Sequence, residues 1–138
     1  MPAATSGYSS TPLFRKLGIE VGTIVLPKFA PTEYPDWLAP LPKDVVFAGR
    51  LSRNTDIVHL FTTERTVLMR ERKNLRPRIR PNAAVWVSWP KKSSKVPTTV
   101  TEDTIRQVAL PMGFVDIKVC AVSEVWSALK LVIRKTLR

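Results

Sequence analysis

The stretch Asp56-Ile57-Val58-His59-Leu60-Phe61 decides the fold class, because it is apolar at nearly every position after the first. A strand with one side in solvent alternates polar and apolar residues, whereas a strand covered by helices on both sides stays apolar. Thr63 follows as the N-cap of a helix expected to reach about Leu75. A second apolar strand is expected at 83–88. A strand, a helix and a strand in this order indicate a parallel sheet.

Toward the N-terminus, the sequence predicts a short helix and a strand. Thr11 is the expected N-cap of the helix, Pro12 suits its first turn, and Gly18 suits a left-handed end. The helix is too short to be stable alone, so it must pack on the rest of the chain. The strand is expected at 23–26, with Pro27 ending it.

Proline density marks the segment that follows. Five prolines lie between positions 27 and 42, which excludes a long helix and favours an ordered loop with one turn near 34–38. Another strand is expected at 44–48. The first half of the chain therefore contributes strands joined by a long loop.

Toward the C-terminus, the sequence predicts one more helix and a hairpin. Thr101 is the expected N-cap of the helix, and Val100 and Ile105 occupy the two positions of a hydrophobic staple. Alternating runs at 115–122 and 126–134 are separated by three residues, a spacing that suits an antiparallel hairpin. The expected fold is therefore α/β, a three-layer Rossmann-like sheet that is mostly parallel with a C-terminal antiparallel hairpin. Residues 11–138 are expected to form this single domain after a mobile tail, 1–10.

Composition limits the setting and the partners. The hydrophobic content of 44% is ordinary for a globular protein, and no run is long enough to span a membrane. Cys120 and His59 are the only cysteine and histidine, so neither a disulfide nor a cysteine or histidine metal site is expected. A reducing, cytoplasmic setting is the simplest interpretation. The net charge of +11 favours an anionic small molecule, an acidic partner or nucleic acid.

Three strand ends are expected to meet at one rim of the sheet, where ligands bind in open α/β folds. Lysines, hydroxyls and the free N–H groups of the helix beginning near Thr63 could hold an anion there, and Trp86 and Trp89 could stack on a ring. The alternative is that Trp86 lies in the core, Trp89 closes the sheet edge and the lysines are solvated. The candidate ligand-binding residues are Trp89, Lys91, Lys92, Ser93, Ser94, Thr62, Thr63 and Lys28.

The helix expected at 63–75 has a basic outer face. Val67, Leu68 and Leu75 mark its inner face. A solvated outer face explains the charges, and a nucleic-acid patch is the other interpretation, although the interleaved aromatic residues of a single-strand platform are missing. The candidate basic surface consists of Arg65, Arg70, Arg72, Lys73 and Arg76.

Two resemblances follow from this layout. The strand from Ala83, the helix from Thr101, the phrase Met112-Gly113-Phe114-Val115 and the closing hairpin resemble the C-terminal half of class I S-adenosylmethionine (SAM)-dependent methyltransferases. The whole chain resembles more closely a bacterial family catalogued as domain of unknown function 3052. This second resemblance implies a small, truncated methyltransferase-like Rossmann domain and no particular activity. It rests on 7–13, 16–19, 60–61, 115–122, 126–130 and the stretch Val85-Trp86-Val87-Ser88-Trp89-Pro90-Lys91-Lys92-Ser93-Ser94.

The expected positions of cofactor-binding residues carry other residue types. A dinucleotide-type site needs glycines after the first strand, where the ligand approaches the backbone, but the chain there reads Leu26-Pro27-Lys28-Phe29-Ala30-Pro31. The second strand should end near an acidic residue and is followed by Arg50 instead. These departures predict that no cofactor is bound, SAM included.

Three functions remain open. The first is a non-catalytic domain that binds an anionic ligand or partner at the 89–94 rim. The alternative is a diverged SAM-dependent methyltransferase. The third is nonspecific nucleic-acid binding through the basic surface, with an affinity that falls with salt.

Overall fold

A computed structural model describes residues 11–138, so the tail predicted at 1–10 lies outside the described residues. The elements are α1 (Leu13–Lys16), β1 (Ile24–Lys28), α2 (Tyr34–Leu38), β2 (Val46–Phe47), β3 (Ile57–Phe61), α3 (Arg65–Leu75), β4 (Ala84–Pro90), α4 (Glu102–Ala109), β5 (Phe114–Ala121) and β6 (Trp126–Ile133). Short 3-10 turns cover Lys92–Ser94, Leu110–Met112 and Lys135–Leu137. None of the described helices is long and apolar enough to cross a membrane.

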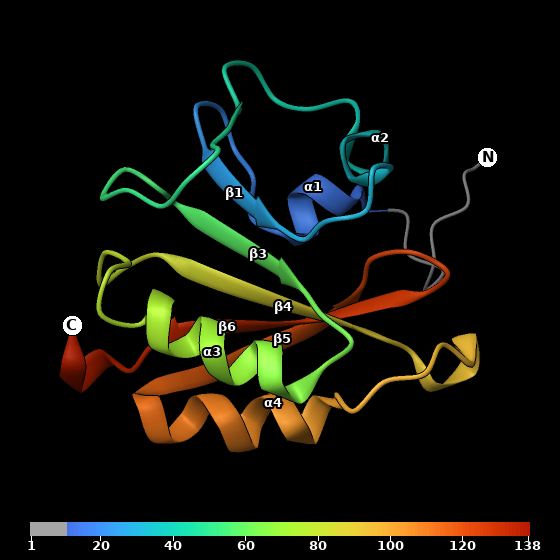
Figure 1. Ribbon diagram of the computed structural model, residues 1–138. Helices are drawn as coiled ribbons and strands as arrows, with labels where there is room; N and C mark the ends of the chain where they lie inside the picture. The colour runs from blue at the N-terminus through green and yellow to red at the C-terminus, as the bar shows by residue number, and fades with distance from the viewer. Residues whose placement is uncertain (1–10) are drawn as a thin grey trace.

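One six-stranded sheet organises the molecule, in the order β2-β1-β3-β4-β6-β5. The strands β1 to β4 are parallel, and β6 runs antiparallel to both β4 and β5. The helices α3 and α4 cover one face, and the shorter α1 and α2 cover the other (Figure 1). The predicted three-layer, Rossmann-like fold with a C-terminal antiparallel hairpin is confirmed.

The strand β3 shows why its sequence is continuously apolar. All five of its residues are buried. Val58 and Leu60 pack against the α3 and α4 side, whereas Ile57 and Phe61 pack against the α1 and α2 side. Both faces of this strand are therefore core, as a covered parallel sheet requires.

The strand β1 continues through Pro27, so the prediction that this proline ends the strand is wrong. Pro27 pairs in register with His59 of β3. On its other side β1 pairs with β2 only at Ile24 and Val25. The Pro27 nitrogen, which carries no hydrogen, faces the β2 side at a position beyond the end of β2. No ladder hydrogen bond is therefore lost there. The strand predicted at 44–48 is correspondingly short.

Two predicted helix caps are replaced by other residues. The residue at the N-cap of α1 is Pro12 rather than Thr11, and that of α3 is Glu64 rather than Thr63. The first amide of α3, on Arg65, donates to the Thr99 hydroxyl at 2.7 Å. This cap comes from a residue distant in sequence, so a local pattern could not reveal it.

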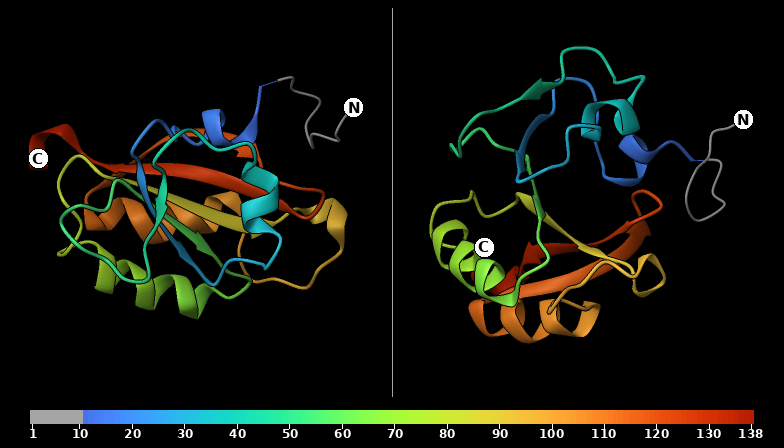
Figure 2. Two further views of the ribbon diagram at one scale, coloured as in Figure 1. Left: turned by 90° about the horizontal axis from the view of Figure 1, so that it is seen from above. Right: turned by 45° about the vertical axis from the view of Figure 1, so that its right-hand side comes forward.

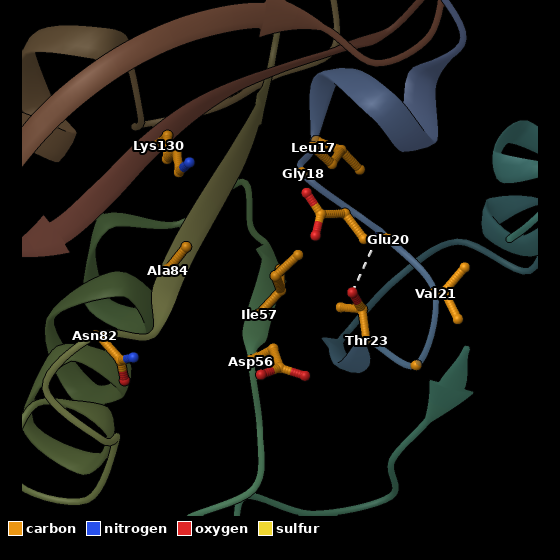
Figure 3. A pocket seen from close by; sticks show the side chains of 11 residues that line it. Leu17, Gly18, Glu20, Val21, Thr23, Asp56, Ile57, Asn82, Ala84 and Lys130 are labelled. Carbon is orange, nitrogen blue, oxygen red and sulfur yellow. Dashed lines mark hydrogen bonds between the residues drawn. The ribbon is translucent and has the colours of Figure 1, made fainter. Parts of the chain in front are cut away.

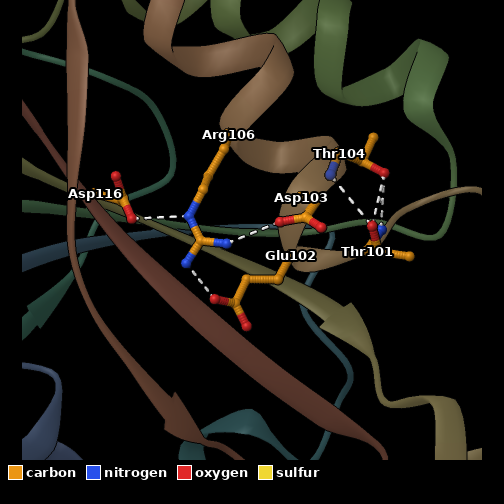
Figure 4. Close-up of polar contacts among 6 residues, drawn as sticks. All are labelled: Thr101, Glu102, Asp103, Thr104, Arg106 and Asp116. Carbon is orange, nitrogen blue, oxygen red and sulfur yellow. Dashed lines mark hydrogen bonds and ion pairs between the residues drawn. The ribbon is translucent and has the colours of Figure 1, made fainter.

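The start of α4 follows the prediction. The Thr101 hydroxyl accepts the Thr104 amide at 3.2 Å, and the Thr101 amide donates back to the Thr104 hydroxyl at 3.1 Å (Figure 4). Val100 and Ile105 are fully buried, as a hydrophobic staple requires. Arg106 joins this helix to β5 by donating to Asp116 at 2.9 Å. That hydrogen bond lowers the pKa of Asp116.

Candidate functional site

The order of the strands places the expected ligand site at the carboxyl edge of β1 and β3. The chain passes from β1 to β2 on one side and then returns to β3 on the other side of β1. Ligands of open α/β sheets bind in the crevice outside such a switch point. In the molecule this edge also holds α2, the loop after β4 and the turn between β5 and β6 (Figures 1 and 2).

The 89–94 segment forms part of this edge and is tied to its neighbours. Trp89 belongs to β4 and is only 8% exposed. The Lys91 amide donates to the Val125 carbonyl at 2.7 Å, and the Ser94 hydroxyl donates to the Lys91 carbonyl at 2.6 Å. Lys92 and Ser93 are exposed. The expectation that Trp86 and Trp89 offer ring faces is wrong, because both side chains are buried in the core.

The groups at the start of α3 are hydrogen-bonded within the protein. The buried Thr62 hydroxyl accepts the Glu64 amide at 3.0 Å. The Thr63 carbonyl accepts the Thr99 amide at 2.9 Å and the Thr98 hydroxyl at 2.8 Å. Thr99 also caps the first amide of α3. The prediction that this first N–H group is free for an anion is therefore corrected.

Lys28 lies at the end of β1 but is drawn toward α3. Its ammonium group pairs with the carboxylate of Glu71, which is 3% exposed. Sequence reasoning assigned Val67, Leu68 and Leu75 to the inner face of α3 and missed Glu71. The signal was available, because Glu71 is three residues after Leu68 and four before Leu75, which places it on the same helix face.

A cavity of about 400 Å³ lies beside this ion pair. Its walls come from the end of β1, the turn after β2 and the end of α3, and include Lys28, Phe29, Arg50 and Arg78. Phe29 has a φ of 58°, in the left-handed region that favours glycine, and its side chain is 60% exposed. The turn after β1 thus has a glycine-like backbone conformation with an aromatic side chain.

Exposed carboxylates surround the same edge. Glu33 precedes α2, Asp36 lies within it, Glu64 follows β3, and Glu124 is in the turn between β5 and β6. None of these four carboxylates is among the candidate residues selected from the sequence. These acidic residues come from separate segments, each of which begins or ends at this edge of the sheet.

A buried polar chain crosses the α1 and α2 side of the sheet. The Tyr34 hydroxyl lies 2.7 Å from Nδ1 of His59, and the Ser88 hydroxyl lies 2.7 Å from Nε2. Burial lowers the pKa of His59 to about 3 and raises the pKa of Tyr34. The neutral imidazole is fully enclosed and satisfied at both nitrogens, so His59 has a structural role.

The predicted basic surface divides into two parts. Arg65, Arg70 and Lys73 are exposed. Arg72 and Arg76 are partly buried and donate to the Val108 carbonyl at 2.6 Å and the Met112 carbonyl at 2.7 Å. These two arginines fasten α3 to the end of α4, so the prediction of a wholly solvated outer face is wrong for them.

The opposite, amino edge of the sheet carries a cavity of about 460 Å³ on the α1 side (Figure 3). Glu20, Asp56 and Lys130 are among its lining residues. The Asp56 carboxylate accepts the Ile24 amide at 2.7 Å and pairs with Arg80, while burial lowers the pKa of Lys130. Asp56 is therefore engaged in holding β1 and the segment before β4.

Solved structures similar to this chain include SAM-dependent methyltransferases. One from Aquifex aeolicus has a TM-score of 0.62 at 12% identity, with 88% of this chain and 87% of that chain covered. A protein assigned to the type 11 methyltransferases from Sulfolobus solfataricus has a TM-score of 0.61 at 10% identity, covering 89% of this chain and 90% of that chain. LepI in complex with SAM gives 0.53 at 11% identity, covering 88% of this chain and 39% of that chain. At these identities the shared feature is the fold.

No protein-family model and no curated protein matches the sequence. The resemblance to domain of unknown function 3052 therefore stays a prediction, while the coarser methyltransferase-like Rossmann domain is supported by the similar structures. The prediction that the chain takes no cofactor is wrong by the same comparison. One of the similar structures is a SAM-dependent methyltransferase, and another is in complex with SAM.

Proposed function

We propose that this chain is a diverged SAM-dependent methyltransferase that holds SAM at the carboxyl edge of β1 and β3. The observation that carries the proposal is the sheet order, which creates a switch point at this edge. The similar fold of two methyltransferases, of which this chain covers 87% and 90%, supports it.

The residues at this edge fit SAM by charge. SAM has a positive sulfonium, a positive ammonium and ribose hydroxyls, all of which favour carboxylate partners. The exposed Glu33, Asp36 and Glu64 supply carboxylates around the switch point. The turn after β1 keeps a left-handed residue, Phe29, where glycine is usual. Its side chain keeps a ligand farther from the backbone than a glycine turn does.

Each residue has a distinct part in this proposal. Glu64 and Glu33 accept hydrogen bonds from the ribose hydroxyls or the ammonium group, and the cofactor supplies an electrophilic methyl group when bound. Lys91 and Lys92, from the loop after β4, attract an anionic acceptor to the same edge. The predicted anion-binding rim is thereby retained as the acceptor side of the site.

Calorimetric titration with SAM and its demethylated product tests the proposal. We expect saturable binding to one site and a loss of affinity of roughly tenfold or more in Glu64→Gln, the scale of a lost charged hydrogen bond. Glu20→Gln is the matched control, because Glu20 is exposed at the opposite edge. Absence of binding to the wild type, or equal losses in both variants, contradicts the proposal.

The acceptor side is tested separately. Thermal unfolding is followed with phosphate compounds added to the wild type and to Lys91→Ala/Lys92→Ala. We expect anions to raise the melting temperature of the wild type more than that of the variant, because the variant lacks the two cations. Equal stabilisation of both proteins removes these lysines from the site.

A further inference from the structure

An arginine-lined groove of about 500 Å³ lies at the amino edge of the sheet and shares Arg78 with the cavity beside Lys28. We call it the arginine groove. Four arginines line it, together with the apolar side chains of Ile133 and Leu137 from the C-terminal segment. The chain brings these residues together from three places, since the C-terminus returns beside the segment that follows α3 (Figures 1 and 2). The arginines are Arg53, Arg76, Arg78 and Arg80.

The segment Arg76-Pro77-Arg78-Ile79-Arg80-Pro81 builds one wall of the groove with little freedom. Both prolines restrict the backbone. Ile79 is 6% exposed and anchors the segment in the core, and its amide donates to the Leu75 carbonyl at 2.9 Å. Arginines alternate with these fixed positions. The backbone positions of these arginines are therefore fixed by packing, so only their side chains need to be ordered on binding.

The charges of the arginine groove are only partly compensated. Arg80 pairs with Asp56, and Nε of Arg76 donates to the neutral Met112 carbonyl. The side chains of Arg53 and Arg78 are exposed and make no hydrogen bond or ion pair with any residue of the described part, 11–138. None of the groove's lining residues is acidic. Guanidinium groups held close together repel one another, and an anion in the groove removes that repulsion.

We propose that the arginine groove binds the phosphodiester backbone of a nucleic acid without reading its sequence. Guanidinium groups bind phosphate oxygens in a two-pronged geometry. No aromatic side chain lines the groove, so stacking on bases is not part of the contact. Further cations follow next to it along the chain, at Arg134, Lys135 and Arg138, which extends the positive surface beyond what one phosphate needs. Contacts of this kind position a nucleic acid and carry no base information.

Fluorescence anisotropy with a labelled duplex and a labelled single strand of mixed sequence tests the proposal. The variant is Arg53→Gln/Arg78→Gln, and the control is Arg15→Gln/Lys43→Gln, which removes the same charge from exposed positions outside the groove. We expect the groove variant to lose roughly tenfold or more in affinity and its duplex salt dependence to fall by a log–log slope of about 2. The control should change affinity by about twofold or less.

Circular dichroism first checks that both variants are folded. Equal losses in the two variants overturn the proposal, since net charge alone then explains the binding. It is also overturned if inorganic tripolyphosphate binds the groove while neither oligonucleotide binds, because the ligand is then a small phosphate compound. The SAM titration uses a different ligand and the Glu64→Gln and Glu20→Gln variants, neither of which changes a residue of the groove, so either proposal can fail while the other stands.

Discussion

The two edges of the sheet treat charge in opposite ways. At the carboxyl edge, Lys28 pairs with Glu71 and Thr99 caps α3, while Lys92 and the carboxylates of Glu33, Asp36 and Glu64 are exposed. At the amino edge, the side chains of Arg53 and Arg78 line the arginine groove with no partner among residues 11–138. Positive charge by itself therefore does not identify a binding site. Of the three lysines selected at the carboxyl edge, Lys28 proved to be structural, while Arg53 and Arg78, whose side chains lack partners among residues 11–138, lie at the other edge.

This contrast has an energetic consequence. A buried charge that loses its partner is strongly destabilising, whereas an exposed charge among like charges contributes nothing to stability or reduces it. Neutralising charges at the two edges should therefore change the free energy of unfolding in opposite directions. Four variants test this contrast, and their expected effects on stability decrease in the order Lys28→Met, His59→Gln, Thr99→Val and Arg53→Gln/Arg78→Gln.

The largest effect is expected for Lys28→Met. It leaves the buried Glu71 carboxylate without its principal cation, since Arg70 Nε is 3.7 Å away and largely exposed. We expect a loss of about 3 kcal/mol in the free energy of unfolding, measured by urea denaturation. Lys28→Met/Glu71→Leu should recover most of it, because no charge then remains buried. A single variant as stable as the wild type contradicts a structural role for this pair.

The next effect concerns His59, which lies between the two edges. Its pKa of about 3 is below the unfolded value of 6.5, so the unfolded chain binds the extra proton as the pH falls. The associated stability is fully present above 6.5 and is lost as the pH falls from 6.5 toward 3. Between neutral pH and pH ~5 the wild type should lose about 2 kcal/mol more than His59→Gln. If urea denaturation gives the wild type and His59→Gln parallel pH profiles of stability, the folded protein does not hold the imidazole neutral.

A smaller effect is expected for Thr99→Val. The substitution keeps the shape of the side chain and removes the hydroxyl that accepts the first amide of α3. We expect a loss of about 1 kcal/mol, typical of a helix cap. Thr32→Val, at an exposed position before α2, is the control and should have little effect. If Thr99→Val is as stable as its control, water replaces the cap and this N–H group is accessible to ligands.

The smallest effect on stability is expected for Arg53→Gln/Arg78→Gln. Because these side chains repel their neighbours and pair with none of the described residues, the melting temperature should stay the same or rise slightly at low salt. High salt should erase the difference from the wild type. A clear loss of stability means that the arginines have structural partners, and it removes the contrast between the edges.

Local sequence patterns determined the elements whose causes are local. The apolar run of β3, the Thr101 cap with its staple and the alternation of the C-terminal hairpin each depend on neighbouring residues, and all were predictable. The order of strands and helices was likewise enough to predict the fold class. Crossover connections between parallel strands are right-handed, which leaves few possible arrangements of the strands.

Only the tertiary structure decided which polar groups are free. Glu71 meets Lys28 across 43 positions, Thr99 reaches α3 across 34, and the arginine groove combines three separate segments. Such pairings depend on which residues packing brings within hydrogen-bond distance, and a residue's neighbours in sequence do not record this. Local sequence patterns were therefore enough to predict the sheet, whereas the packing of distant segments determined which lysines and arginines have partners within the protein.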